Sequence, residues 1–316
     1  MESTRDKPFM TYEQQVKKLV KDKHLEICDC EYAIRLLKEH SYFALISGYK
    51  KPFKQKDGTY KLHTRIEDIY ALYKFDDQLR TIFLKYILKI EKHIKSLMSY
   101  SFCEAYGEEQ LHYLNATNYN YNVQTQDHIN ELISRLAAIT QDPKNYPYIK
   151  HQQNKHGNIP LWVMMKALTL GTVSKMYSFF PQKIQQNVSK EFDYVNESML
   201  VRFLDLLARV RNVCAHNERL YDYSYRKGTI DDTYVHVALK IARRNGRFVK
   251  GKNDLYAVVI AMKYLLTDAD FKNLIMELDE AVTTLLEETR MIEQTQLEKY
   301  MGFPSNWKDI KDIEKQ

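Results

Sequence analysis

Hydrophobic residues recur along this chain at intervals of three and four, the spacing that gives a helix one buried face. The clearest example is residues 72–102, where lysines occupy the side opposite an apolar stripe. The stripe consists of Leu79, Ile82, Phe83, Tyr86, Ile87, Ile90, Ile94, Leu97 and Met98. This pattern predicts one long amphipathic helix.

The same spacing predicts further helices at residues 11–25, 30–48, 128–140, 161–179, 197–219, 254–266 and 269–296. Residues 223–253 are the least regular part of the chain and have room for a short hairpin. With only 9 Gly and 7 Pro in 316 residues, the chain has too few turn residues for a sheet-based fold. We therefore expect an all-α helical bundle forming a single domain over residues 1–316, with an N-terminal helical region at 1–70 and a helical core at 71–300.

Composition and the absence of several known short motifs exclude some classes of protein. The first ten residues lack the apolar core of a signal peptide, and no apolar run approaches the ~18 residues of a membrane span. The four cysteines lack the paired spacing of a metal or redox site, and no Gly-rich phosphate loop occurs. We expect a cytoplasmic protein outside the membrane, with reduced cysteines and without a metal or other cofactor.

One predicted helix, at residues 197–219, carries polar side chains where packing would favour apolar ones. The motif is Arg211-Asn212-Val213-Cys214-Ala215-His216. Asn212 and His216 are four residues apart and therefore share one helix face. Arg211 lies about 140° around the helix from His216, so it reaches the same site only through its length or from a second helix.

These side chains suit the cleavage of RNA by its own 2′-hydroxyl group. Histidine can remove the 2′ proton or protonate the leaving 5′ oxygen, and arginine can neutralise the phosphate. Asn212 can orient the imidazole or a phosphate oxygen. Because the substrate supplies the nucleophile, this reaction needs no metal. We assign catalytic roles to Arg211, Asn212 and His216, and accessory roles to the neighbouring Arg209 and Asn217.

A second feature is a basic segment, at residues 233–253, that contains no acidic residue. Its basic members are Lys240, Arg243, Arg244, Arg247, Lys250 and Lys252. Tyr234 and Phe248 are interleaved with them. The pattern fits RNA held through phosphates and stacked bases, and it equally fits a solvated loop.

The motif resembles the HEPN signature, in which an arginine and a polar residue precede a histidine. The longer string is similar to the RN-x-CAH segment of the Abi family of bacterial abortive-infection proteins, of the AbiD and AbiF type. Three more blocks resemble that family in the same order: Ser47-Gly48-Tyr49, Tyr73-Lys74-Phe75-Asp76 and Met301-Gly302-Phe303-Pro304. Residues 217–222 depart from it, because such proteins often have a second histidine and an aromatic–Asn pair there.

This resemblance implies a HEPN-like helical core that carries the motif at residues 211–216. It implies a metal-independent endoribonuclease toxin of an anti-phage, abortive-infection system, leaving 2′,3′-cyclic phosphate ends. HEPN nucleases form one site from two motifs, so a homodimer is implied as well. The implied partners are substrate RNA and a cognate, structured non-coding RNA that restrains the toxin, as in a toxin–antitoxin pair.

Two other functions fit the same residues. One is an RNA-binding module that grips a structured RNA without cutting it. The other is a structural or protein-interaction bundle, which would have no RNA affinity. A nuclease should lose activity but keep RNA binding when His216 is replaced, whereas a binding module should lose affinity.

Overall fold

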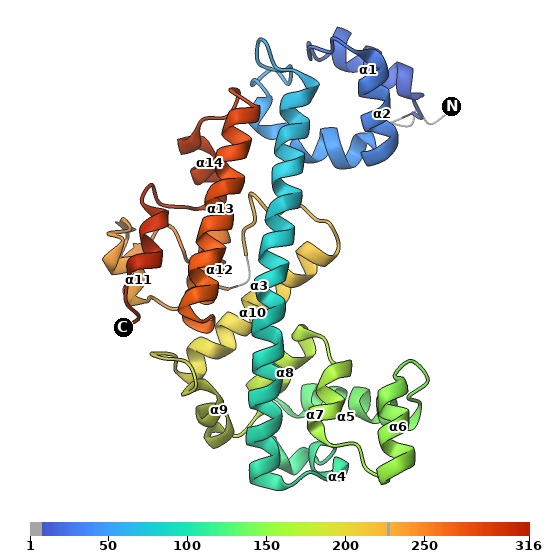
Figure 1. Cartoon of the computed structure of the whole chain (residues 1–316), viewed down its shortest axis with the longest axis vertical. Helices are drawn as coiled ribbons and strands as arrows, with labels where there is room; N and C mark the ends of the chain where they lie inside the picture. Colours follow the sequence, from blue (N-terminus) through green and yellow to red (C-terminus); the bar gives the residue numbers. More distant parts are fainter. Residues whose placement is uncertain (1–7, 226–227) are drawn as a thin grey trace.

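The computed structural model describes residues 8–225 and 228–316, and this part of the chain is mostly helical (Figure 1). The α-helices are α1 (Tyr12–Lys21), α2 (Cys30–His40), α3 (Ile66–Tyr106), α4 (Gln110–Tyr113), α5 (Gln126–Gln141), α6 (Pro147–His156), α7 (Leu161–Met164), α8 (Leu170–Phe179), α9 (Gln182–Ser189), α10 (Glu197–Ala215), α11 (Tyr234–Ala238), α12 (Leu255–Leu265), α13 (Asp268–Glu288) and α14 (Gln294–Met301). The shorter helical segments are η1 (Phe43–Ser47), η2 (Lys51–Phe53), η3 (Ala116–Asn118), η4 (Met165–Ala167) and η5 (Trp307–Asp312).

The only strands within the described ranges are β1 (Arg243–Arg244) and β2 (Arg247–Phe248), which pair antiparallel as a small hairpin. The predicted all-α class is therefore confirmed, and so is the short hairpin within residues 223–253. Residues 1–7 of the predicted N-terminal region and residues 226–227 of the irregular segment lie outside the described residues.

Helix α3 is the element around which the others are arranged. It has 41 residues and is about 60 Å long at 1.5 Å per residue. Figure 1 shows α13 beside its upper half, α10 crossing its middle, and α7 and α9 beside its lower half. Buried hydrophobic side chains from Val16 to Ile310 form one cluster around it. The predicted stripe of α3 is buried, apart from Leu97, which is partly buried.

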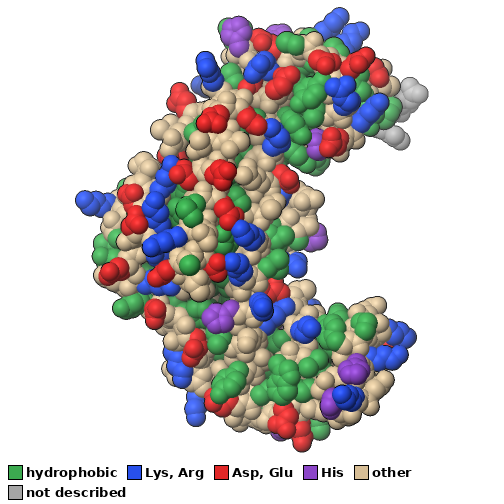
Figure 2. All heavy atoms as spheres, viewed as in Figure 1, with side chains coloured by type: hydrophobic (Ala, Val, Ile, Leu, Met, Phe, Trp, Pro, Cys, Tyr) green, Lys and Arg blue, Asp and Glu red, His purple; other side chains and the backbone are tan. Residues whose placement is uncertain are grey.

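The molecule is hollowed on one side, the right side of Figure 2. The N-terminal helices α1 and α2 lie above this hollow, and the lobe formed by α5, α6 and α7 lies below it (Figures 1 and 2). The C-terminal end of α10 emerges between them, to the right of α3. The part of the chain that carries the motif therefore reaches the hollowed side.

Several helices end where the apolar pattern alone does not predict an end. The helix predicted at residues 30–48 stops at His40, because Ser41 has a φ of 59°. The one predicted at residues 161–179 is interrupted by extended backbone at Leu168, with ψ of 139°. Helices α6 and α9 occupy stretches for which the pattern predicts no helix.

No helix in the described part of the chain combines the length and apolar composition that crossing a membrane requires. All four cysteines lie in this part, and none of them forms a disulfide.

Candidate active site

The motif lies at the C-terminal end of α10, where the chain turns back on itself. Asn217 has a φ of 53°, in the left-handed region. The amide of Glu218 donates to the carbonyl of Val213 at 3.0 Å, and that of Asn217 donates to Cys214 at 3.3 Å. This pair of hydrogen bonds is a Schellman motif, which satisfies carbonyls that a helix end leaves without partners. The helix predicted to run to residue 219 therefore ends at Ala215, and His216 is its C-cap residue.

Asn217 thus has a backbone role, in addition to the accessory chemical role assigned from the sequence. We expect Asn217→Gly to leave the free energy of unfolding unchanged or slightly higher, since glycine adopts positive φ freely. Asn217→Ala should lower it by about 1 kcal/mol, because a Cβ disfavours this region. Urea unfolding of the two variants tests this. Equal stability of both would contradict the role.

The three predicted catalytic residues are brought to this end of α10 in different environments. Asn212 and His216 are exposed, and the amide of His216 donates to the carbonyl of Asn212 at 2.9 Å, one turn earlier. Arg211 is half-buried, and its Nε is covered but has no hydrogen-bond partner among the described residues. The histidine and asparagine therefore face solvent, while the stem of the arginine lies at the edge of the core.

The cysteine of the motif is unsuited to nucleophilic chemistry. Cys214 is only 4% exposed. Burial raises the pKa of its thiol to about 12, so the thiol stays protonated near neutral pH. The motif therefore offers its imidazole, amide and guanidinium groups for chemistry, and Cys214 serves packing.

The backbone just after the motif is held by a buried carboxylate from α3. We call residues 217–222 the post-motif segment. Asp76, which is 0% exposed, accepts hydrogen bonds from the amides of Leu220 at 3.0 Å and Tyr221 at 2.6 Å. The side chains of Leu220 and Tyr221 are themselves fully buried. The position of His216 is therefore set from both sides, by α10 before it and by Asp76 after it.

Two more side chains complete what we call the Asp76 cluster, formed by Tyr49, Asp76 and Arg80. The Tyr49 hydroxyl donates to Asp76 at 2.6 Å, and Arg80 Nη1 donates to it at 2.8 Å. Arg80 also donates to the exposed Asp77 at 2.9 Å and to the carbonyl of Glu218 at 3.4 Å. Burial raises the pKa of Asp76, and the tyrosine and arginine offset part of that effect. Four donors point at this carboxyl group, so its surroundings match the carboxylate form.

The post-motif segment is also tied to the N-terminal region. Arg219 donates to the carbonyl of Gly48 at 2.7 Å and to Asp222 at 2.6 Å. Lys51 lies 3.6 Å from the same Asp222 carboxylate. The role of Asp76 was not predicted from the sequence, where it belongs only to a family-like block. A usable signal was present, since Asp76 and Arg80 are two charges four residues apart within an otherwise apolar helix face.

The predicted accessory residue Arg209 is engaged in contacts within the chain. Its guanidinium makes two 3.1 Å hydrogen bonds with Asp205 and lies 4.8 Å from the centre of the Tyr225 ring. The Tyr225 hydroxyl donates to the same carboxylate at 2.8 Å. These contacts raise the pKa of Arg209, chiefly through the Asp205 hydrogen bonds. Arg209 thereby holds the chain after the post-motif segment against α10.

The basic segment is partly neutralised by an acidic residue that precedes it. Asp232 pairs with Lys252 at 2.6 Å and with Arg243 at 3.8 Å. Lys250 donates to the carbonyl of Phe303 at 2.6 Å. The remaining basic side chains are exposed and have no ion pair within the described ranges: Lys240, Arg244 and Arg247.

The hairpin does not lie beside the motif within one chain. Arg202 of α10 pairs with Asp231, next to the Asp232 that contacts the hairpin. Arg202 precedes His216 by 14 residues, which is about 21 Å along a helix. Figure 1 shows the same separation, with the hairpin region near α11 on the left and the end of α10 on the right. The two predicted RNA-contacting elements are therefore apart.

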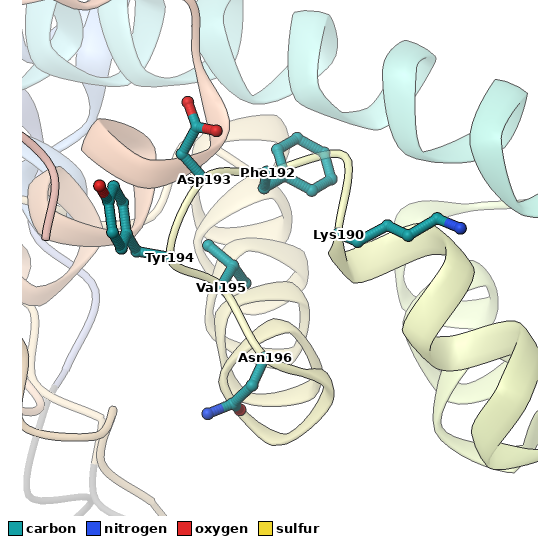
Figure 3. A pocket seen from close by; sticks show the side chains of 6 residues that line it. All are labelled: Lys190, Phe192, Asp193, Tyr194, Val195 and Asn196. Carbon is teal, nitrogen blue, oxygen red and sulfur yellow. The ribbon is translucent and has the colours of Figure 1, made fainter.

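A surface hollow at the opposite end of α10 is also separate from the motif. It lies in the loop between α9 and α10, and Figure 3 shows its lining side chains. They are Lys190, Phe192, Asp193, Tyr194, Val195 and Asn196. No predicted site residue is among them.

A family model described as Abi-like protein matches residues 35–222, which is more than half of the chain. The chain therefore belongs to the Abi-like family. The matched region contains the motif, the post-motif segment and the whole Asp76 cluster, whereas the basic hairpin lies beyond it. No curated protein matches the chain, and neither does any solved structure.

Proposed function

We propose that this member of the Abi-like family is a metal-independent endoribonuclease toxin of an abortive-infection system. It cleaves RNA through attack of the 2′-hydroxyl on the adjacent phosphate and leaves a 2′,3′-cyclic phosphate. Arg211, Asn212 and His216 are its catalytic residues. The family supports a role in abortive infection, and the side-chain chemistry of the motif supports the reaction.

The main support for the proposal is that the motif histidine is exposed while the backbone around it is fixed. His216 is exposed at the end of a helix that reaches the hollowed side of the molecule, and the backbone on both sides of it is fixed. A general acid or base needs this combination, because it must reach substrate and yet hold its orientation. A histidine that served packing alone would be buried.

The reaction needs one base and one acid. An imidazole acts as the base and removes the 2′ proton, and a separate acid protonates the leaving 5′ oxygen. Arg211 stabilises the charge that builds on the phosphate, and Asn212 orients the imidazole or a phosphate oxygen. One chain supplies one histidine in this motif, so a second motif would provide the second acid–base group.

The reaction type can be tested with purified protein and RNA in excess chelator. We expect cleavage to continue, because the nucleophile belongs to the RNA, and the upstream product to carry a 2′,3′-cyclic phosphate. An RNA with hydrogen in place of the 2′-hydroxyl at the cut site should stay intact. Loss of cleavage in chelator, or products with a 3′-hydroxyl, would contradict this mechanism.

We also propose that two chains share one active site across a twofold axis. Arg211 lies about 140° around α10 from His216 on a regular helix, so a guanidinium from a partner chain reaches the phosphate more readily. Adding excess His216→Ala chains to wild type should therefore reduce activity further than dilution predicts. Mixing with the exposed-surface variant His156→Ala should have no such effect. Full activity from a demonstrated monomer would refute the shared site.

The basic hairpin fits a secondary contact with RNA. Lys240, Arg244 and Arg247 are exposed and positive. They suit contacts with the phosphates of an RNA strand that extends out of the active site. Their distance from His216 within one chain means that such an RNA would extend well beyond the scissile bond.

A further inference from the structure

A groove lies between the lower half of α3 and the segment formed by α7 and η4. Its lining includes Leu88, Glu91, Lys92, Lys95, Trp162 and Lys166. None of these residues belongs to the motif or to the Asp76 cluster. In Figure 1, α7 lies beside α3 below the hollowed side, and Figure 2 shows hydrophobic and basic side chains together on this lobe.

The walls of the groove expose two large apolar side chains. Trp162 is 50% exposed and Leu88 is 46% exposed. The other tryptophan, Trp307, is fully buried, which is where so large an apolar side chain is usually placed. A half-exposed indole in a groove is a flat surface on which another ring can stack.

Positive charge surrounds this surface. Lys92 and Lys166 are exposed on opposite sides of the groove, one on α3 and the other on η4. Lys95 is partly buried and donates to Glu91 at 2.6 Å and to the carbonyl of Leu168 at 2.6 Å. It therefore offsets the one carboxylate of the lining, and the two exposed lysines give the groove a net positive charge.

The carboxylate of the groove has an oxygen without a partner. Glu91 is 8% exposed, and its Oε1 accepts from Lys95. Its Oε2 has no hydrogen-bond partner among the described residues. An unpaired buried carboxylate oxygen destabilises the folded protein, because it has lost its hydrogen bonds to water without gaining others. A ligand that brings an N–H donor would relieve this cost after a small movement of the side chain.

We propose that this groove binds one nucleotide of single-stranded RNA, and the inference rests on RNA being the substrate of the proposed function. The base stacks on the Trp162 indole, and its exocyclic amine donates to Glu91. The flanking phosphates lie near Lys92 and Lys166. Stacking on an aromatic side chain with cations nearby is the usual way in which proteins hold unpaired bases. The carboxylate adds a preference for bases with an exocyclic amine, which are cytosine, adenine and guanine, over uracil, which has none.

The position of the groove suits a strand that also reaches the motif. Lys92 lies 16 residues from Asp76 along α3, or about 24 Å. At 3.4 Å per nucleotide of stacked strand, about seven nucleotides cover that length. A bound strand of ten nucleotides is therefore long enough to cover this axial distance along α3.

Tryptophan emission tests the proposal directly, because the chain has only two tryptophans and Trp307 is buried. The full-length protein is titrated with ten-nucleotide cytidine and uridine strands that carry 2′-O-methyl groups and so resist the proposed cleavage. We expect the cytidine strand to quench the emission and to bind about tenfold more tightly than the uridine strand. Trp162→Ala should weaken binding of a labelled cytidine strand about tenfold.

Two further variants make the test specific. Tyr100→Ala removes an aromatic side chain that is 68% exposed on the same helix but outside the groove, and it should leave affinity within about twofold. Glu91→Gln should bring the two strands within about twofold of each other, because an amide can pair with either base. If Glu91→Gln does not fold, the comparison of Trp162→Ala with Tyr100→Ala decides the outcome.

The proposal is overturned if the strands bind without quenching, if no strand binds, or if Trp162→Ala and Tyr100→Ala behave alike. Cleavage of unmodified RNA is measured in parallel. Cleavage without quenching would refute the groove and leave the nuclease function in place. Quenching without cleavage would support the groove and refute the nuclease function.

Discussion

Replacing His216 by alanine is expected to lower the rate of RNA cleavage by about a hundredfold or more. In the proposed reaction the His216 imidazole is the group of the motif that transfers a proton. RNA affinity should change by less than about twofold, because the arginine and the other basic side chains remain. Single-turnover rates at saturating RNA, measured together with equilibrium binding, separate the two quantities.

A matched control uses another exposed histidine. His156 lies at the end of α6, and His156→Ala should leave both the rate and the affinity unchanged. Urea unfolding of His216→Ala should match wild type, since its side chain is exposed. If affinity falls while the rate at saturation stays normal, the protein is an RNA-binding module and not a nuclease.

The positions of most long helices were predictable, because their apolar residues mark a buried face or, in α12, a helix that is buried on all sides. The apolar stripe of α3 and the hydrophobic run of α12 were visible in the spacing alone. Helix ends were less predictable, because single backbone angles set them. Ser41 and Asn217 both have positive φ. Serine and asparagine adopt positive φ in only some positions, so the residue type alone does not predict these two helix ends. The short helix α6 was missed because it begins at Pro147, in a stretch rich in chain-breaking residues.

Part of the candidate site could likewise be predicted from local sequence spacing, and part depends on contacts between residues far apart in the chain. Asn212 and His216 are four residues apart, so helix geometry alone placed them on one face. Asp76 contacts amides 144 and 145 residues further along the chain, a relation that no local pattern encodes. For the same reason, the partial neutralisation of the basic segment could not be predicted from the sequence. Asp232 lies next to it in sequence, yet only the folded chain shows that the carboxylate returns to pair with Lys252.

Replacing Asp76 by alanine should lower the free energy of unfolding by about 3–5 kcal/mol, because it removes one partner of a buried ion pair. The carboxyl group is 0% exposed, and its loss leaves Arg80 without its closest counter-charge. The amides of Leu220 and Tyr221 would also lose their acceptor in a site that water does not reach. Urea unfolding followed by circular dichroism measures the change.

The neighbouring carboxylate provides the control. Asp77 pairs with the same arginine at 2.9 Å, but its side chain is 62% exposed. Asp77→Ala should therefore lower the free energy of unfolding by less than about 1 kcal/mol. The difference in unfolding free energy between the two variants measures how much burial and the contacts with the post-motif segment add to the Asp76–Arg80 ion pair. In the remaining folded fraction of Asp76→Ala, amide hydrogen exchange should be faster at Leu220 and Tyr221 than in wild type, because their acceptor is gone. Equal losses of stability for Asp76→Ala and Asp77→Ala, with unchanged exchange at these two amides, would show that Asp76 does not hold the backbone beside His216.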